Sequence, residues 1–293
     1  MNRGILLALS AYIFWGLHPI YWKFLKHVPS TQIVSHRIIW SLLFFVLILS
    51  FRKEWKGLFE KVKASENKLM LFFPGLLIGS NWAVYIWAVN ANFIIETSLG
   101  YFISPLVIVF LGVIFLSERL RYFQWFSIAM AGCGVIFMAV VYGNIPWISL
   151  YLAGTWGCYG LLRKKSNLTA VEGLTLETAM LSVFAFSYLT YIGLRGETLF
   201  FHDAQTSFML IGAGIISGLP LIIFIVASKL INLSLIGILQ YIYPTIIFAI
   251  GVFIYDEPFT TAKLVGFTFV WLALIIYSIE STIYLRKKAV AAV

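Results

Sequence analysis

Long apolar segments separated by short polar ones run along almost the whole chain. A membrane span needs roughly 20 mostly apolar residues to cross a hydrocarbon core about 30 Å thick. The segments that meet this requirement are approximately 4–22, 33–51, 70–89, 97–117, 122–141, 146–162, 174–193, 208–228, 233–255 and 262–284. The pattern predicts an all-α membrane protein with ten transmembrane helices.

Composition excludes a soluble globular protein. Of the 293 residues, 61% are hydrophobic and only 11% are charged, and the mean hydropathy is +0.94. A soluble domain needs more charge on its surface than this. The net charge of +9 would also fit a nucleic-acid-binding protein, but the basic residues lie between apolar segments and form no patch among aromatics. We therefore expect the lipid bilayer, and no nucleic acid, as a partner.

The distribution of Lys and Arg predicts the orientation, because cytoplasmic loops of membrane proteins are enriched in these residues. If the N-terminus is cytoplasmic, sixteen of them fall on the cytoplasmic side: Arg3, Arg52, Lys53, Lys56, Lys61, Lys63, Lys68, Arg119, Arg121, Arg163, Lys164, Lys165, Lys229, Arg286, Lys287 and Lys288. Four fall on the other side: Lys23, Lys26, Arg195 and Lys263. We expect a multi-pass protein of the cytoplasmic membrane with both termini in the cytoplasm.

One set of residues occurs twice in the chain. Gly75, Gly79, Pro105, Gly112 and Glu118 recur at one constant spacing, without a gap, as Gly214, Gly218, Pro244, Gly251 and Glu257. The pair Trp15-Gly16 recurs at almost the same spacing as Trp156-Gly157. The repetition predicts two five-helix repeats, 1–144 and 145–293, within one membrane domain. Because five is odd, the second repeat would have the inverted orientation found in many secondary transporters.

Two prolines mark a candidate substrate cavity. Pro105 and Pro244 fall near the bilayer centre, where each removes a backbone hydrogen bond. Tyr101 and Gln240 precede them by one turn on the same helix face, and Ser104 and Tyr243 lie close by. Broken backbone at this depth is tolerated where it lines a wet cavity or is packed in protein. The alternative is a pair of structural kinks.

Other polar side chains are at a depth compatible with the same cavity. His18 shares a helix stripe with Trp15, and Tyr159 occupies the matching position of the second repeat. Asn81 and Tyr85 are one turn apart on the third predicted helix. The alternative for His18 is a packed, hydrogen-bonded histidine.

Four ionisable residues within or at the ends of predicted spans are candidates for gating or coupling. They are His36, Arg37, Glu96 and Glu177. A charge at membrane depth is costly and marks a functional site by default. The alternative for Arg37 is snorkelling to the interface. For Glu96 and Glu177 it is a stabilising position at a helix N-terminus.

The repeated acidic and glycine residues predict structural roles. Glu118 and Glu257 follow the fourth and ninth helices, where each is expected to accept hydrogen bonds from the start of the next helix. Gly75 with Gly79, and Gly214 with Gly218, form GxxxG patterns that let helices approach closely.

Several strings in the chain resemble one family of membrane proteins. They are His36-Arg37 with Trp40-Ser41, Asn81-Trp82, Trp87-Ala88-Val89-Asn90, Ser98-Leu99-Gly100-Tyr101-Phe102 through Pro105, Tyr159-Gly160-Leu161 with Arg163-Lys164-Lys165, and Gln240-Tyr241 through Pro244. Together they are similar to the RarD family, which belongs to the EamA group of the drug/metabolite transporter superfamily. The resemblance covers nearly the whole chain. It implies ten helices in two inverted repeats, a location in the bacterial inner membrane, and transport of small molecules.

The leading functional hypothesis is a secondary transporter that exports small amphipathic metabolites or drug-like molecules by alternating access through a central cavity. The alternative is a channel or a lipid-handling membrane protein. An enzyme is disfavoured, because the chain lacks the HExxH motif and the P-loop GxxxxGK[ST]. We expect no cofactor and no metal, and the sequence does not indicate an oligomeric state.

Overall fold

The computed structural model describes residues 3–91, 93–143, 146–255 and 261–290, and these residues form twelve helices. The helices are α1 (Arg3–Lys23), α2 (Ser30–Phe51), α3 (Trp55–Ala64), α4 (Leu69–Asn90), α5 (Ile94–Leu116), α6 (Tyr122–Tyr142), α7 (Trp147–Lys165), α8 (Ala170–Leu194), α9 (Ala204–Leu230), α10 (Leu233–Gln240), α11 (Ile242–Ile254) and α12 (Thr261–Val290). No strand occurs in the described ranges. The all-α prediction is confirmed for them.

Within the described ranges, eight helical stretches are long and apolar enough to cross a membrane. They are Arg3–Lys23, Ser30–Phe51, Leu99–Leu116, Tyr122–Val141, Ala170–Leu194, Ala204–Leu230, Leu233–Ile254 and Leu264–Ser281. α4 contributes a shorter apolar stretch, Leu71–Tyr85. The chain is therefore a multi-pass membrane protein, while ten crossings and inverted repeats stay predictions.

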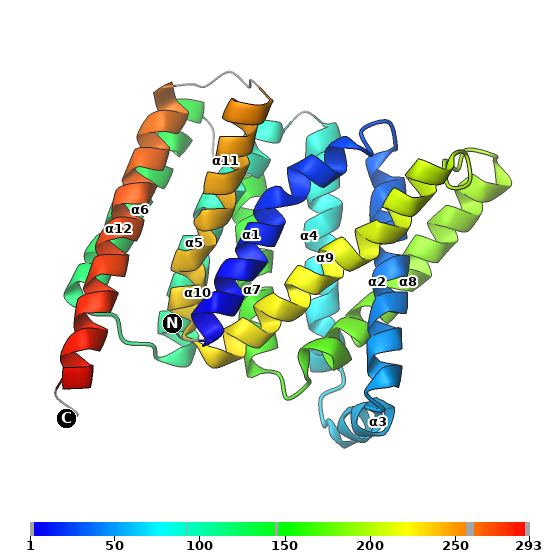
Figure 1. Ribbon diagram of the computed structural model, residues 1–293, viewed down its shortest axis with the longest axis horizontal. Coiled ribbons are helices and arrows are strands. Elements are labelled where there is room, and N and C mark those ends of the chain that lie inside the picture. Colours follow the sequence, from blue (N-terminus) through cyan, green and yellow to red (C-terminus); the bar gives the residue numbers. More distant parts are fainter. Residues whose placement is uncertain (1–2, 92, 144–145, 256–260, 291–293) are drawn as a thin grey trace.

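Helices from the two halves of the chain are interleaved. α2 packs against α8 and α9, α1 against α9 and α11, α5 against α7 and α10, and α6 against α12. The N- and C-terminal ends and α3 lie at the same edge of the molecule (Figure 1). Many large apolar side chains face outward, including Phe184 and Phe253, which are 70% and 78% exposed. An apolar exterior is what lipid contact requires.

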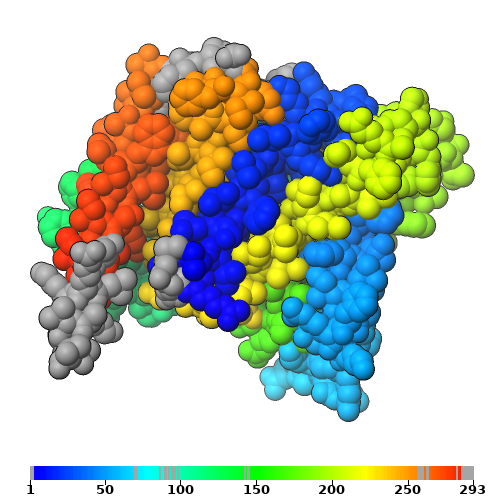
Figure 2. All heavy atoms as spheres, in the orientation of Figure 1, coloured from blue at the N-terminus to red at the C-terminus, as the bar shows by residue number. Residues whose placement is uncertain are grey.

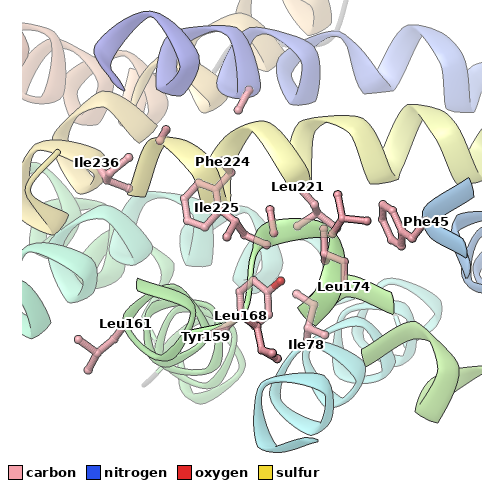
Figure 3. Close-up of a cluster of buried hydrophobic side chains, with 14 of the residues drawn as sticks. Phe45, Ile78, Tyr159, Leu161, Leu168, Leu174, Leu221, Phe224, Ile225 and Ile236 are labelled. Carbon is pink, nitrogen blue, oxygen red and sulfur yellow. The ribbon is translucent and has the colours of Figure 1, made fainter. Parts of the chain in front are cut away.

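The main apolar core joins both halves. Figure 3 shows Phe45 of α2 and Ile78 of α4 in the same cluster as Leu221 and Phe224 of α9. Tyr159 of α7 also belongs to this cluster and is fully buried. The halves therefore share one core, as expected for a single membrane domain.

A ten-residue helix between the second and third apolar segments, α3, was not predicted from the sequence. It is too short to span a bilayer, and it projects from one edge of the molecule (Figure 2). The Lys61 ammonium donates to both carboxylate oxygens of Glu172, each at 2.8 Å. Glu172 also forms a capping box with Thr169 at the start of α8. This ion pair connects α3 to α8.

The helix formed by α10 and α11 is interrupted, whereas its counterpart α5 is continuous. α10 ends at Gln240, and Pro244 follows four residues later. Proline has no N–H to donate to the carbonyl of Gln240, so one helical hydrogen bond is missing at the interruption. Pro105 lies within continuous α5. Its carbonyl oxygen would be 2.7 Å from a methyl group added at Gly237, so α5 and α10 cross at very short range.

Glu118 caps α10 from the end of α5. Its carboxylate accepts hydrogen bonds from the backbone N–H of Leu233 at 2.6 Å and of Ser234 at 2.8 Å. Glu118 therefore caps α10, which belongs to the second half of the chain. It does not cap α6, the helix that follows α5. At α6 the side chain of Gln124 accepts from the N–H of Arg121 instead. Glu257, the repeat partner of Glu118, lies outside the described residues.

The GxxxG glycines lie at helix contacts between the halves. A methyl group added at Gly214 of α9 would lie 2.6 Å from the backbone nitrogen of Ser41 in α2. One added at Gly75 of α4 would lie 3.2 Å from the Cα of Glu177 in α8. Gly79 and Gly218 contact Leu181 and Phe45 in the same two interfaces.

We expect Gly214→Ala to destabilise the protein by about 1–3 kcal/mol, because the added methyl group meets backbone atoms that cannot rotate away. Gly132→Ala in α6 is the matched control, since nothing lies within 4 Å of the added group there. Unfolding of the purified protein in detergent measures both. Equal stability of the two variants would contradict the close α2–α9 contact.

Candidate functional site

A cavity of about 350 Å³ lies between the two halves of the chain. Its walls come from α1, α2, α4, α5, α7, α9, α10 and α11. The lining residues are Tyr12, Trp15, His18, Pro19, Trp22, Arg37, Asn81, Trp82, Tyr85, Thr97, Gly100, Tyr101, Ser104, Leu152, Trp156, Leu221, Gln240, Tyr243 and Ile247.

Most of the residues that the sequence assigned to a cavity lie on this wall. Those that do are Trp15, His18, Asn81, Tyr85, Tyr101, Ser104, Gln240 and Tyr243. Pro105, Pro244 and Tyr159 are not on it. Both prolines are buried between helices, and α10 covers Pro105 where the two helices cross. Tyr159 is fully buried and its hydroxyl donates to Glu177.

Two contacts on the wall are equivalent under exchange of the repeats. The side-chain amide of Gln240 donates to the hydroxyl of Ser104 at 3.0 Å. The rings of Tyr101 and Tyr243 meet edge to face, with centroids 5.1 Å apart. Tyr101 is related to Gln240, and Ser104 to Tyr243, by the same spacing that relates Pro105 to Pro244. Exchange of the two repeats therefore converts one of these contacts into the other.

The repeated tryptophans also meet. The rings of Trp15 and Trp156, which are repeat equivalents, contact edge to face at 5.4 Å. Phe224 packs against both rings, with centroids 5.6 Å and 5.2 Å away. The indole N–H of Trp156 donates to the side-chain oxygen of Gln240 at 3.2 Å. An apolar, aromatic surface thus adjoins the polar crossing of α5 and α10.

Two other polar side chains on the wall have partners in the protein. His18 Nε2 is 3.2 Å from the carbonyl oxygen of Ile216. The amide of Asn81 donates to the carbonyl of Leu152 and to the hydroxyl of Thr155, each at 2.9 Å. These bonds hold α1 to α9 and α4 to α7, so the two side chains also serve packing.

Arg37 is the one cation among the lining residues that the structure describes. Its guanidinium lies over the ring of Trp82, 4.0 Å from the centroid. Its Nε is buried without a hydrogen-bond partner. Because the side chain faces this interior cavity, snorkelling to the interface does not describe it.

Two other candidates for gating or coupling, His36 and Glu177, lie away from the cavity wall. The imidazole of His36 is 6% exposed and stacks on Phe200 with centroids 4.7 Å apart. The side chain of Glu96 lies outside the described residues. Glu177 is buried beside Arg163, with an Oε1–Nε distance of 3.5 Å, and their side chains are 2% and 1% exposed.

Arg163 was counted with the cytoplasmic loop charges in the sequence, but it is buried inside the protein. Its guanidinium also donates to the carbonyl of Thr169 at 3.1 Å. Gly173 makes room for it, since a methyl group there would collide with the Arg163 guanidinium. Tertiary contacts of this kind leave no signal in hydropathy.

Other wall residues were missed although the sequence held a signal for some of them. Trp156 is the repeat partner of Trp15. Tyr12 lies three residues before Trp15, on the helix stripe that Trp15 shares with His18 and Trp22. Ile247 lies one turn after Tyr243.

Comparison with known proteins identifies the family. Residues 2–140 match the model of the EamA-like transporter family. Protein RarD of Escherichia coli (strain K12) is 40% identical over 291 residues, covering 98% of this chain and 97% of that protein. The chain belongs to the RarD family of EamA-like transporters. The resemblance seen in the sequence is thereby confirmed.

Other members are similar over a comparable length. The uncharacterized transporter YojE of Bacillus subtilis (strain 168) is 40% identical, covering 97% of this chain and 96% of that protein. The chloramphenicol-sensitive protein RarD of Pseudomonas aeruginosa is 31% identical over 298 residues, covering 98% of this chain and 97% of that protein. One solved crystal structure superposes with a TM-score of 0.70 over 94% of this chain and 96% of its own, at 16% identity, which shows the fold alone. This RarD-family chain is thus a membrane transporter and not an enzyme.

We expect Glu177→Ala to destabilise the protein by about 3–5 kcal/mol, because removing one partner of a buried ion pair leaves the other charge unpaired. The double variant Glu177→Leu with Arg163→Met removes both charges and is expected to regain most of that loss. Denaturant unfolding in detergent measures the difference, with Glu60→Ala, 67% exposed, as the control. If Glu177→Ala is as stable as Glu60→Ala, the Arg163–Glu177 ion pair does not contribute the expected stability.

Proposed function

We propose that this RarD-family chain is a secondary transporter that exports small amphipathic molecules by alternating access through the central cavity. The observation that carries the proposal is the composition of the cavity wall. Repeat-related residues from both halves meet there, at Trp15 with Trp156 and at the two equivalent contacts of Tyr101 and Gln240. Relative movement of the halves would change the wall directly.

The proposed fold has ten spans. α4 and α7, with 22 and 19 residues, join the eight stretches already described. They lie among the other long helices in Figure 1. The edge that holds both termini and the basic helix α3 is proposed to face the cytoplasm, since Lys and Arg concentrate there. The bacterial relatives support the inner membrane as the location.

The helix contacts support two inverted repeats, 1–144 and 145–293. Exchange of the halves relates α1 to α7, α2 to α8, α4 to α9, α5 to α10–α11, and α6 to α12. The contact of α5 with α7 then corresponds to that of α10–α11 with α1, and α4 with α8 corresponds to α9 with α2. The contacts of α2 with α8 and α6 with α12 correspond to themselves. The match of the family model to residues 2–140 fits a family unit of one repeat.

The cavity suits a small molecule with an apolar body. Its volume of about 350 Å³ is within the usual range of roughly 300–1,000 Å³ for such sites. Eight of the nineteen described lining residues are Tyr or Trp, and a few polar groups could orient a ligand. One relative is named for chloramphenicol sensitivity, which agrees with drug-like or metabolite-sized compounds as the substrate class. In alternating access the halves would rock about this site near the midplane.

Flux into proteoliposomes tests the proposal. We expect Tyr101→Ala and Gln240→Ala each to lower the flux of transported compounds by at least about tenfold, because each removes a wall contact and its counterpart stays unpaired. Tyr122→Ala, at an exposed tyrosine outside the cavity, is the matched control.

Two results would contradict this function. One is normal transport by both cavity variants. The other is single-channel conductance in a planar bilayer, which would favour the alternative of a channel.

A further inference from the structure

Among the residues that the structure describes, the guanidinium of Arg37 has no carboxylate partner to balance its charge. Arginine stays protonated in proteins, so it cannot lose its charge when it is buried. A charge in the membrane interior is paired or faces water in nearly all cases. Among the described residues, Arg37 forms no ion pair, and Nε has no hydrogen-bond acceptor.

Other arginines in the same protein show what a structural partner looks like. Arg163, buried like Arg37, lies 3.5 Å from the Glu177 carboxylate. Arg121 forms a two-pronged ion pair with Glu280 at the end of α12. In both cases a carboxylate of the protein balances the guanidinium. No carboxylate of a described residue lines the cavity around Arg37.

The second half of the chain supplies no compensating charge. Thr178 occupies the repeat position of Arg37, by the spacing that relates Trp15 to Trp156. Its hydroxyl donates to the carbonyl of Leu174 in its own helix. The ring contact of Trp15 with Trp156 joins repeat equivalents, but the positive charge of Arg37 has no equivalent in the second half.

The surroundings of Arg37 are arranged to accept an anion. Trp82 covers one face of the guanidinium, with its ring centroid 4.0 Å from Cζ. Tyr85, Tyr101 and Tyr243 lie close enough to interact with it electrostatically, and all three line the cavity. Their hydroxyls are hydrogen-bond donors of the kind that a carboxylate accepts.

We propose that Arg37 binds a carboxylate of the transported molecule, so that the substrate class is a small amphipathic anion whose apolar body contacts Trp15 and Trp156. A planar guanidinium matches a carboxylate in two parallel charge-assisted hydrogen bonds. The aromatic surface of the two tryptophans lies on the same cavity and would hold the apolar part. This inference rests on the proposed transport through the cavity and adds the charge of the substrate.

Calorimetric binding of matched acid and amide pairs to the purified protein tests it. The pairs are phenylacetate with phenylacetamide, and indole-3-acetate with indole-3-acetamide, which differ in charge but hardly in shape. We expect the acid to bind at least about tenfold more tightly than its amide, a difference of about 1.4 kcal/mol. Arg37→Gln is expected to abolish this preference with little effect on the amide, and Arg37→Lys to keep part of it.

The controls separate binding from folding. Arg119→Gln makes the same chemical change at an exposed site and should leave the preference intact. Arg37→Lys keeps the positive charge, so a partial acid preference in this variant indicates an anion site and not damage to the fold. The unfolding midpoints of all variants measure their stability directly.

Three results would overturn the inference: equal binding of acid and amide by the wild type, an unchanged preference in Arg37→Gln, or no binding of either pair. Flux of neutral compounds distinguishes this failure from that of the proposed function. If Gln240→Ala abolishes neutral flux while Arg37→Gln does not, transport stands and the anion site is rejected. If no compound is transported but acid binding depends on Arg37, the anion site stands and the proposed transport is rejected.

Discussion

The close crossing of α5 and α10 brings together the polar residues at the centre of the cavity wall. It is possible because Gly237 has no side chain where the carbonyl of Pro105 approaches. Glu118 fixes the start of α10 on the end of α5 with hydrogen bonds of 2.6 and 2.8 Å. After the interruption at Tyr241, Tyr243 of α11 meets Tyr101 of α5. The polar wall of the cavity is a direct consequence of this crossing.

Lipid imposes a second constraint, because buried polar groups without partners are costly. The cavity wall obeys it almost everywhere. Gln240, Asn81 and His18 each have protein partners, and these contacts hold helices together. Among the described wall residues, Arg37 is the exception, since its Nε is buried without a hydrogen-bond partner. A site that is satisfied except at one charge is pre-organised for a ligand of the opposite charge, which links the packing of the helices to the choice of substrate.

Hydropathy and repetition predicted much of the fold and of the site. Nine of the ten apolar segments each overlap one long helix of the described residues, and the segment 233–255 corresponds to the pair α10 and α11, since the length of an apolar stretch is a local property. The polar residues one turn before each proline lie on the cavity wall, as helix periodicity requires. The prolines themselves do not, because burial at the crossing depends on a distant glycine. The helix capped by Glu118, the pairing of Arg163 with Glu177, and the position of α3 likewise depend on tertiary contacts. Periodicity in one segment carries no information about them.

Opposite orientation of the two halves is the central claim, and thiol labelling tests it most directly. Lys26 and Asn167 are both exposed, and they are repeat equivalents by the spacing that relates Trp15 to Trp156. Each would be replaced by cysteine in a chain whose Cys133 and Cys158 have been changed to serine. If the halves are inverted, a membrane-impermeant maleimide labels Lys26→Cys in intact cells and Asn167→Cys only after permeabilisation. Labelling of both positions from the same side would contradict it.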